Sequence, residues 1–137
     1  MTIVEGKIKE KDRPRLGRFG AYTTTDTVNY ENWVKLCYQN QEGKYLEGQI
    51  KAQITAYYKI PKSYSKKRIE AIRKGNEYPQ KKPDADNIGK IILDALNNIA
   101  YKDDSQVVEL TVYKKFTEEV ERVEFELKEI KESEGVK

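Results

Sequence analysis

The chain has 137 residues, of which 36% are charged and 37% apolar, so its composition predicts one globular domain with a solvated surface and excludes full disorder. It contains no histidine, which excludes histidine-metal nucleases and imidazole-dependent triads and leaves carboxylates, lysine or tyrosine for hydrolytic chemistry. Its single cysteine, Cys37, excludes an intrachain disulfide, and its net charge is +3. The sequence has no N-terminal apolar run and no membrane span, so a cytoplasmic protein is expected.

The N-terminal part of the chain is predicted to form a strand, a loop and a helix. Residues 2–9 mix β-branched residues with alternating charge, as strands do. Residues 10–25 hold a proline, two glycines and four basic residues, which indicates a loop. A helix is expected to begin near Asp26 or Thr27 and to continue through residue 40. Its predicted core-facing residues are Val28, Trp33, Val34 and Cys37.

The middle of the chain shows the clearest strand pattern, at residues 47–60. Apolar and mostly polar residues alternate there. The apolar face consists of Ile50, Ala52, Ile54, Ala56 and Tyr58. After it, Ser63 or Ser65 is expected to cap a short basic helix that ends at Gly75. Residues 106–116 and 121–130 resemble two closing strands, interpreted as a hairpin.

A helix bracketed by aspartates is predicted in KPDADNIGKIILDALNNIAYKDDSQ, residues 82–106. Its apolar residues recur at the spacing of one helical stripe. They are Ile88, Ile91, Ile92, Ala95, Leu96 and Ile99. On the opposite side Asp86, Lys90 and Asp94 recur every four residues, in a row that points away from the core.

A left-handed turn is expected at the end of this helix. Asn97 and Asn98 follow its last apolar turn, and asparagine tolerates left-handed backbone better than most residues. The chain can then turn back and bring Asp103 and Asp104 toward the same end of the sheet.

These charged residues also have plainer interpretations. Asp84 or Asp86 could simply cap the helix, and Lys90 could be a solvated ion-pair partner of its neighbours. A calcium loop is excluded, because Ile88 and Ala95 stand where such a loop needs oxygen ligands.

Charge is distributed unevenly along the chain. Residues 1–82 contain 18 Lys and Arg against 9 Asp and Glu, a net charge of +9, whereas residues 83–137 contain 8 against 14, a net charge of −6. Such a field could guide a polyanion toward an acidic centre whose carboxylates a metal ion neutralises. An ordinary lysine-rich, solvated surface is the alternative.

The motif order resembles the RusA family of Holliday junction resolvases, which are crossover junction endodeoxyribonucleases. KPDADNIGKIILDALN followed by YKDDSQV is similar to the family signature of Lys-Pro-Asp-x-Asp-Asn, a helix lysine, Asp-Ala-Leu and Asp-Asp-x-Gln. Upstream, DRPRLGRFGAYTTTDTVNYE resembles the Arg-Pro-Arg, Gly and Tyr-Thr pattern of phage and prophage members, so the resemblance covers most of residues 11–108. Asn98 departs from the glycine that members often have, which concerns the tightness of the turn.

The resemblance implies an α+β domain with a mixed sheet packed by helices, over residues 1–130, followed by a flexible tail, 131–137. It implies catalysis by Asp84, Asp86, Lys90 and Asp104, and metal binding by Asp84, Asp86, Asp103 and Asp104. The implied cofactor is Mg²⁺, with Mn²⁺ as a substitute, which suits phosphodiester hydrolysis without histidine. Asp94 is interpreted as support for this site or as a partner of Lys90, with a purely structural role equally open.

The expected substrate is a four-way DNA junction, cut by a homodimer whose two sites match its two-fold symmetry. Phosphate contacts are expected from Arg13, Arg15, Arg18, Lys66, Lys67, Arg68, Lys81 and Lys82. Phe19 and Tyr22 could stack on an unpaired base or anchor their loop to the core. Flaps and forks stay open as substrates, and the alternative function is a non-cleaving branched-DNA-binding protein or a structural partner in a phage recombination complex.

Overall fold

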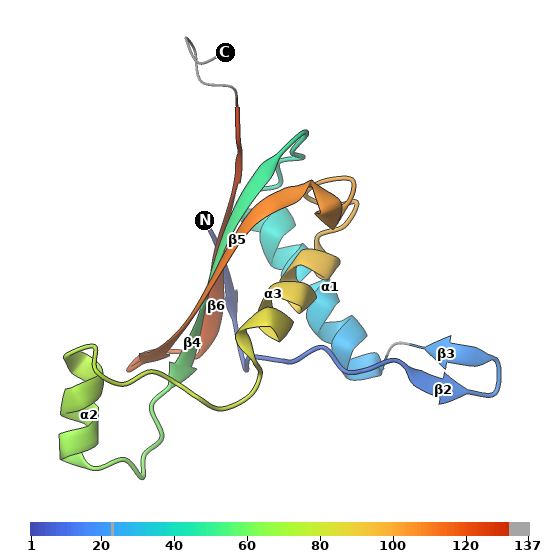
Figure 1. The fold of residues 1–137 in the computed structure, drawn as a ribbon. Coiled ribbons are helices and arrows are strands. Elements are labelled where there is room, and N and C mark those ends of the chain that lie inside the picture. Colours follow the sequence, from blue (N-terminus) through green and yellow to red (C-terminus); the bar gives the residue numbers. More distant parts are fainter. Residues whose placement is uncertain (23, 132–137) are drawn as a thin grey trace.

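The computed structural model describes residues 1–22 and 24–131, arranged as one small α+β domain (Figure 1). In chain order the elements are β1 (Thr2–Glu5), β2 (Arg15–Gly17), β3 (Gly20–Tyr22), α1 (Thr25–Gln41), β4 (Ile50–Lys59), α2 (Lys66–Arg73), α3 (Ala85–Ala95), the 3₁₀ helix η1 (Asp104–Gln106), β5 (Val107–Thr117) and β6 (Arg122–Glu129). The predicted tail lies outside the described residues from residue 132 onward. No helix in the described ranges has the length and apolar character needed to cross a membrane.

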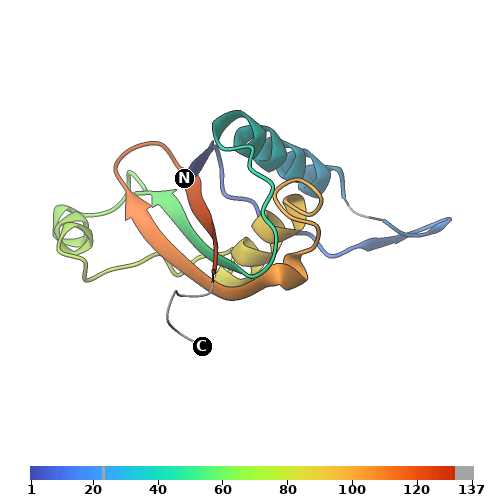
Figure 2. The ribbon, with the colours of Figure 1, turned by 90° about the horizontal axis from the view of Figure 1, so that it is seen from above.

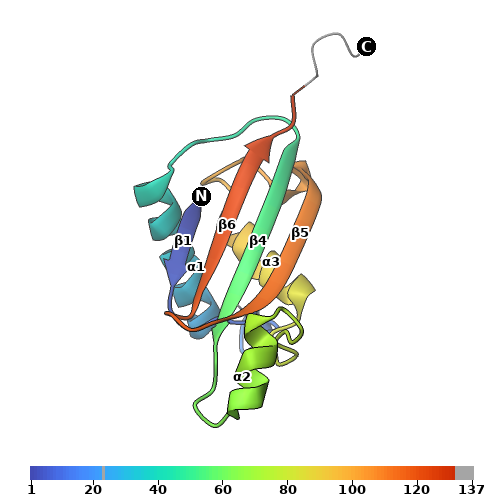
Figure 3. The same cartoon turned by 90° about the vertical axis from the view of Figure 1, so that its left-hand side faces the viewer.

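The main sheet has the strand order β1-β6-β4-β5 (Figure 3). It is mixed, as predicted, because β4 pairs in parallel with β5 and antiparallel with β6. The predicted hairpin between residues 106–116 and 121–130 is therefore wrong, since β4 lies between these two strands. Every second residue of β4 is buried, and such a strand satisfies its backbone donors and acceptors most completely in the middle of a sheet.

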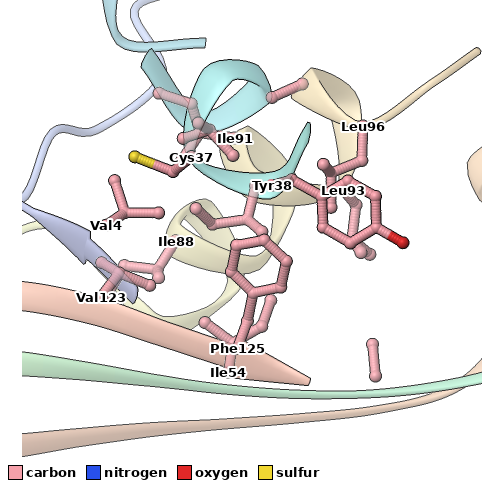
Figure 4. Close-up of a cluster of buried hydrophobic side chains, with 14 of the residues drawn as sticks. Val4, Cys37, Tyr38, Ile54, Ile88, Ile91, Leu93, Leu96, Val123 and Phe125 are labelled. Carbon is pink, nitrogen blue, oxygen red and sulfur yellow. The ribbon is translucent and has the colours of Figure 1, made fainter. Parts of the chain in front are cut away.

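Helices α1 and α3 cover one face of this sheet, and among the described residues no helix covers the opposite face (Figures 1 and 3). The core lies between the layers, where the alternating face of β4 meets the apolar stripe of α3, as both patterns predict (Figure 4). Gly89 lets α3 approach β5 closely. A Cβ atom there would lie 3.1 Å from Leu110 Cδ2 and 3.3 Å from Val112 Cγ2.

Helix α1 packs with a narrower apolar face than predicted. Val34 and Cys37 are buried, but Val28 is 40% exposed and Trp33 43% exposed. The Trp33 indole instead donates a hydrogen bond to the Glu5 carbonyl oxygen, 2.8 Å away, and so covers the outer edge of β1. The helix therefore uses its tryptophan to satisfy a strand edge, which its position in the sequence does not reveal.

The predicted N-terminal strand and loop both differ from the structure. Strand β1 is shorter than residues 2–9 because it ends before Gly6, which has a φ of 125°. The predicted loop contains a small antiparallel hairpin, β2–β3, which projects away from the main sheet (Figure 1). Its tip is closed by Gly20, with a φ of 110°, a conformation that only glycine adopts readily.

Candidate functional site

The solvent-facing side of α3 carries the predicted acidic row. Asp84 occupies the N-cap position, yet its side chain makes no cap hydrogen bond, so a simple capping role does not account for it. Asp86 and Lys90 are exposed, while Asp94 is partly buried. The row therefore presents carboxylates and one ammonium group to solvent along the helix, as the four-residue spacing predicts.

Two sheet residues hold the segment that leads into Asp84. The Tyr58 hydroxyl, from β4, donates to the Pro83 carbonyl oxygen at 3.2 Å. The Lys114 ammonium, from β5, donates to the Lys81 carbonyl oxygen at 2.6 Å. Burial lowers the pKa of Lys114, while the negative charge of Asp84 acts in the opposite direction. Both strands thus fix the start of α3, and neither contact was evident from sequence.

At the other end of α3, Asp94 lies beside Asp104. Burial and the neighbouring carboxylates of Asp94 and Asp103 raise the pKa of Asp104 above its usual range. The Lys11 ammonium lies 2.6 Å from Asp94 Oδ2 and 3.2 Å from Glu31 Oε2. Asp94 therefore has Lys11 as its ion-pair partner, in place of the Lys90 considered from sequence.

Sequence reasoning missed Lys11, Glu31 and Asn87. The Asn87 side chain accepts a hydrogen bond from the Lys11 backbone N–H at 2.6 Å, which fixes the N-terminal segment against α3. Lys11 and Asn87 are 76 positions apart. The available signals were the position of Lys11 beside the Arg-Pro-Arg motif and that of Asn87 at the end of the Lys-Pro-Asp-x-Asp-Asn signature, but no periodicity connects residues this distant.

The loop after α3 positions the second pair of aspartates. Asn98 has a φ of 65°, so the predicted left-handed turn is confirmed. The Asp103 side chain accepts from the Ser105 backbone N–H at 3.0 Å and caps η1, and these bonds lower the pKa of Asp103. The Asp104 backbone N–H donates to Asn97 Oδ1 at 2.8 Å. Asp103 thus has a structural task, while backbone contacts orient Asp104.

The four predicted metal ligands do not form one cluster. Within residues 1–22 and 24–131, no group of three or more His, Cys, Asp or Glu side chains is placed to hold an ion. Asp84 and Asp94 lie at opposite ends of α3, roughly 15 Å apart along the helix axis. The donors nevertheless fit Mg²⁺, which prefers hard oxygen ligands, keeps several waters and often binds only one or two carboxylates together with substrate phosphates.

Two projections flank α3 (Figures 1 and 2), and both carry basic residues. One is the β2–β3 hairpin, and the other is α2, which is capped by Ser65, one of the two serines predicted for this role. Arg68 already has contacts within the protein: its Nε lies 2.7 Å from Glu77 Oε2, and its guanidinium stacks 3.6 Å above the Tyr64 ring centroid. The predicted phosphate contacts exposed on or beside these projections are Arg13, Arg15, Arg18, Lys66, Lys67, Arg68, Lys81 and Lys82.

Phe19 lies at the tip of the β2–β3 hairpin and is 97% exposed, so it does not anchor this segment to the core. The Tyr22 side chain lies outside the described part of the structure.

Helix α3 with its aspartates thus lies between two projections that carry basic residues. The model of the endodeoxyribonuclease RusA family matches residues 5–128, nearly the whole chain, which places it in a nuclease class. The chain belongs to the RusA family, and the resemblance of its motifs is confirmed. It is also 35% identical over 131 residues to the uncharacterized protein YqaN of Bacillus subtilis (strain 168), an alignment that covers 94% of this chain and 84% of that protein.

Proposed function

We propose that this protein is a Mg²⁺-dependent, structure-selective endodeoxyribonuclease that resolves Holliday junctions by paired nicking of two strands in DNA recombination and repair. The observation that supports this best is the acidic row of α3, exposed between two basic projections in a RusA family member. The basic projections would hold the DNA backbone, and the carboxylates of the row would bind the ion beside a phosphate of that backbone.

The proposed catalytic residues are Asp84, Asp86, Lys90 and Asp104, and Asp103 is a further proposed metal ligand. Mg²⁺, or Mn²⁺ as a substitute, would offset the phosphate charge and make water more acidic. Lys90 is exposed one helical turn from Asp86, so its ammonium can reach the phosphate as charge develops there. Burial and, after it, the neighbouring carboxylates of Asp94 and Asp103 raise the pKa of Asp104, and a divalent cation bound there would offset the repulsion between these carboxylates.

We further propose that the active species is a homodimer. A four-way junction has approximate two-fold symmetry and needs two cuts, whereas each chain supplies one acidic helix. Two chains related by a two-fold axis would present matched sites to the two strands.

A non-cleaving branched-DNA-binding protein is the second candidate. It is favoured by the separation of Asp84 from the Asp94 and Asp104 pair, because carboxylates that do not share an ion need not catalyse. The Asp84 side chain is exposed and makes no cap hydrogen bond. This is harder to explain in a protein that only binds DNA, since an acidic residue there would repel phosphate.

The test is incubation of an end-labelled four-way junction with the protein and Mg²⁺, with both nicks mapped at nucleotide resolution. Flap, fork and linear duplex substrates of the same sequence are the comparators. Symmetric nicks in the junction, absent with EDTA, are expected. Tight binding of the junction without any nick in Mg²⁺ or Mn²⁺ would instead support the non-cleaving candidate.

A further inference from the structure

Two lysines from different parts of the chain share one aromatic ring beside Asp84. The ammonium nitrogen of Lys81 lies 5.4 Å from the Tyr58 ring centroid, and that of Lys114 lies 5.5 Å from it. Tyr58 is 1% exposed, so its position is fixed by the core. Both distances are in the range of cation–π contacts, which hold a cation against a ring face.

The strand register explains why Lys114 is there. Lys114 pairs with Ala56 of β4, whose side chain faces the helix-covered side of the sheet. Alanine leaves space for the lysine stem to run along the sheet toward α3. The next residue, Lys115, points to the opposite face and lies 5.2 Å from the Tyr113 ring centroid. Two consecutive lysines therefore have opposite surroundings.

The charges around Lys114 are suited to an anion. Its ammonium donates one of three possible hydrogen bonds to the Lys81 carbonyl oxygen. Two ammonium groups thus lie near the Tyr58 ring, and an anion within reach of both would be attracted by each of them. Asp84 is the acidic group that acts on Lys114, and Lys81 precedes it by three positions. A phosphate held here would therefore lie next to a proposed catalytic carboxylate.

A groove continues from Lys81 toward α2. This cavity, of about 430 Å³, is lined by Tyr64, Arg68, Tyr78 and Lys81, among others. Its lining includes the carboxylate of Glu77, which pairs with Arg68. The aromatic and basic side chains are of the kinds that accommodate a nucleic-acid strand through its bases and its backbone. A DNA strand whose phosphate bound the lysine pair could continue along this groove toward α2. A free phosphate ion would occupy the lysine pair alone and make no contact with the groove.

We propose that Lys81 and Lys114 form a phosphate-binding subsite on Tyr58, which holds a DNA backbone phosphate beside Asp84; this inference rests on the proposed nuclease function. Lys81 alone is an exposed lysine in a basic segment. Lys114 adds what the sequence does not suggest, namely a strand residue on the helix side of the sheet that contacts the substrate directly.

The test compares Lys114→Met with Lys115→Met and Lys114→Arg. Binding of a labelled four-way junction is measured in EDTA over a series of salt concentrations, so that neither metal nor cleavage contributes. Lys114→Met is expected to weaken binding about tenfold, the loss of one charge-assisted hydrogen bond, and to lower the slope of log K against log salt by about 0.9. Lys115→Met should match wild type, and Lys114→Arg should retain the wild-type slope.

An unchanged affinity and slope in folded Lys114→Met would overturn the proposal. If Lys114→Met fails to fold, as judged by circular dichroism, Lys81→Met decides the question, because Lys81 is exposed and outside the sheet. A wild-type slope in that variant would equally overturn the proposal. Failure of the nuclease function is a separate result: wild type would leave the junction uncut in Mg²⁺ while the salt slopes still report on the subsite.

Discussion

The ammonium nitrogen of Lys11 lies 2.6 Å from Oδ2 of Asp94, a residue 83 positions away in the chain. Both side chains are partly buried, with exposed fractions of 21% and 22%. Burial disfavours the Lys11 ammonium, but Asp94 and Glu31 outweigh this effect and raise the pKa of Lys11. The N-terminal segment thus supplies a permanent positive charge to the acidic end of α3, next to Asp104.

Removing this charge should destabilise the protein. We expect Lys11→Met to lower the free energy of unfolding by about 1–2 kcal/mol, because the partly buried Asp94 and Glu31 carboxylates then lose their counter-ion. Urea unfolding measures this loss, and the exposed Lys7→Met is the control. In the double mutant with Asp94→Asn the two losses should be clearly non-additive. Additive losses would show that Lys11 stabilises the fold through other contacts.

Asp104→Asn should stabilise the metal-free protein at neutral pH. The folded-state pKa of Asp104 is raised, so its ionised form costs stability once the pH rises above that value. Solvent screening limits the gain to less than about 1 kcal/mol, a rise in Tm of up to about 4 °C. The difference from wild type should shrink as the pH falls toward about 3.9, the usual aspartate pKa. Thermal melts in EDTA across this range measure it, and a lower Tm for the variant would contradict the prediction.

Neutralising the proposed catalytic carboxylates should separate cleavage from binding. Asp84→Asn, Asp86→Asn and Asp104→Asn are each expected to abolish junction cleavage while leaving binding unchanged or tighter, because phosphate repulsion falls as the metal site is lost. For Lys90→Ala the loss of rate should exceed the loss of affinity, since its proposed role is at the transition state. Gel assays of cleavage and binding, with circular dichroism as the folding control, test this. Wild-type nicking by any aspartate variant removes that residue from the site.

The β2–β3 hairpin should contribute to affinity and not to stability. Replacing Arg13, Arg15 and Arg18 together is expected to weaken junction binding across unrelated sequences and to reduce its salt dependence by up to about 0.9 per lost phosphate contact. The unfolding free energy should stay within about 0.5 kcal/mol of wild type, because these residues are exposed on the hairpin or, for Arg13, just before it. Binding titrations on several junction sequences provide the measurement. An effect confined to certain sequences would indicate that the hairpin reads bases.

A dimer should cut both strands of a junction within one binding event. On a supercoiled plasmid that extrudes a cruciform, paired nicking yields linear product, whereas a single nick relaxes the plasmid and removes the substrate. Mixing wild type with excess Asp84→Asn protein should form heterodimers that nick once and shift the product from linear to nicked circles. The linear-to-nicked ratio is the readout. The dimer mechanism would be excluded if analytical sedimentation showed a monomer at working concentrations and the ratio stayed unchanged on mixing.

Local patterns in the sequence predicted the parts of this fold that depend on neighbouring residues. The alternation in β4, the apolar stripe of α3, the Ser65 cap and the left-handed Asn98 all follow from side-chain period or from backbone preference. The motif order was likewise enough to identify the family and to select Asp84, Asp86, Lys90, Asp103 and Asp104 as candidates. These properties depend on residues that are close together in the sequence, so they can be predicted without knowing how the rest of the chain packs.

Only the tertiary structure decided which distant residues meet. Strand β4 lies between β5 and β6 because its backbone groups and its buried face are best satisfied in the centre of the sheet, which no local hairpin pattern reveals. The register of β5 against β4 places Lys114 on the helix-covered face of the sheet, with Ala56, and Lys115 on the opposite face. The contact of Lys11 with Asp94 likewise depends on how the N-terminal segment packs across α3. Such pairings depend on the free energy of the whole packed domain, so the residues that surround the candidate site could be recognised only once the fold was known.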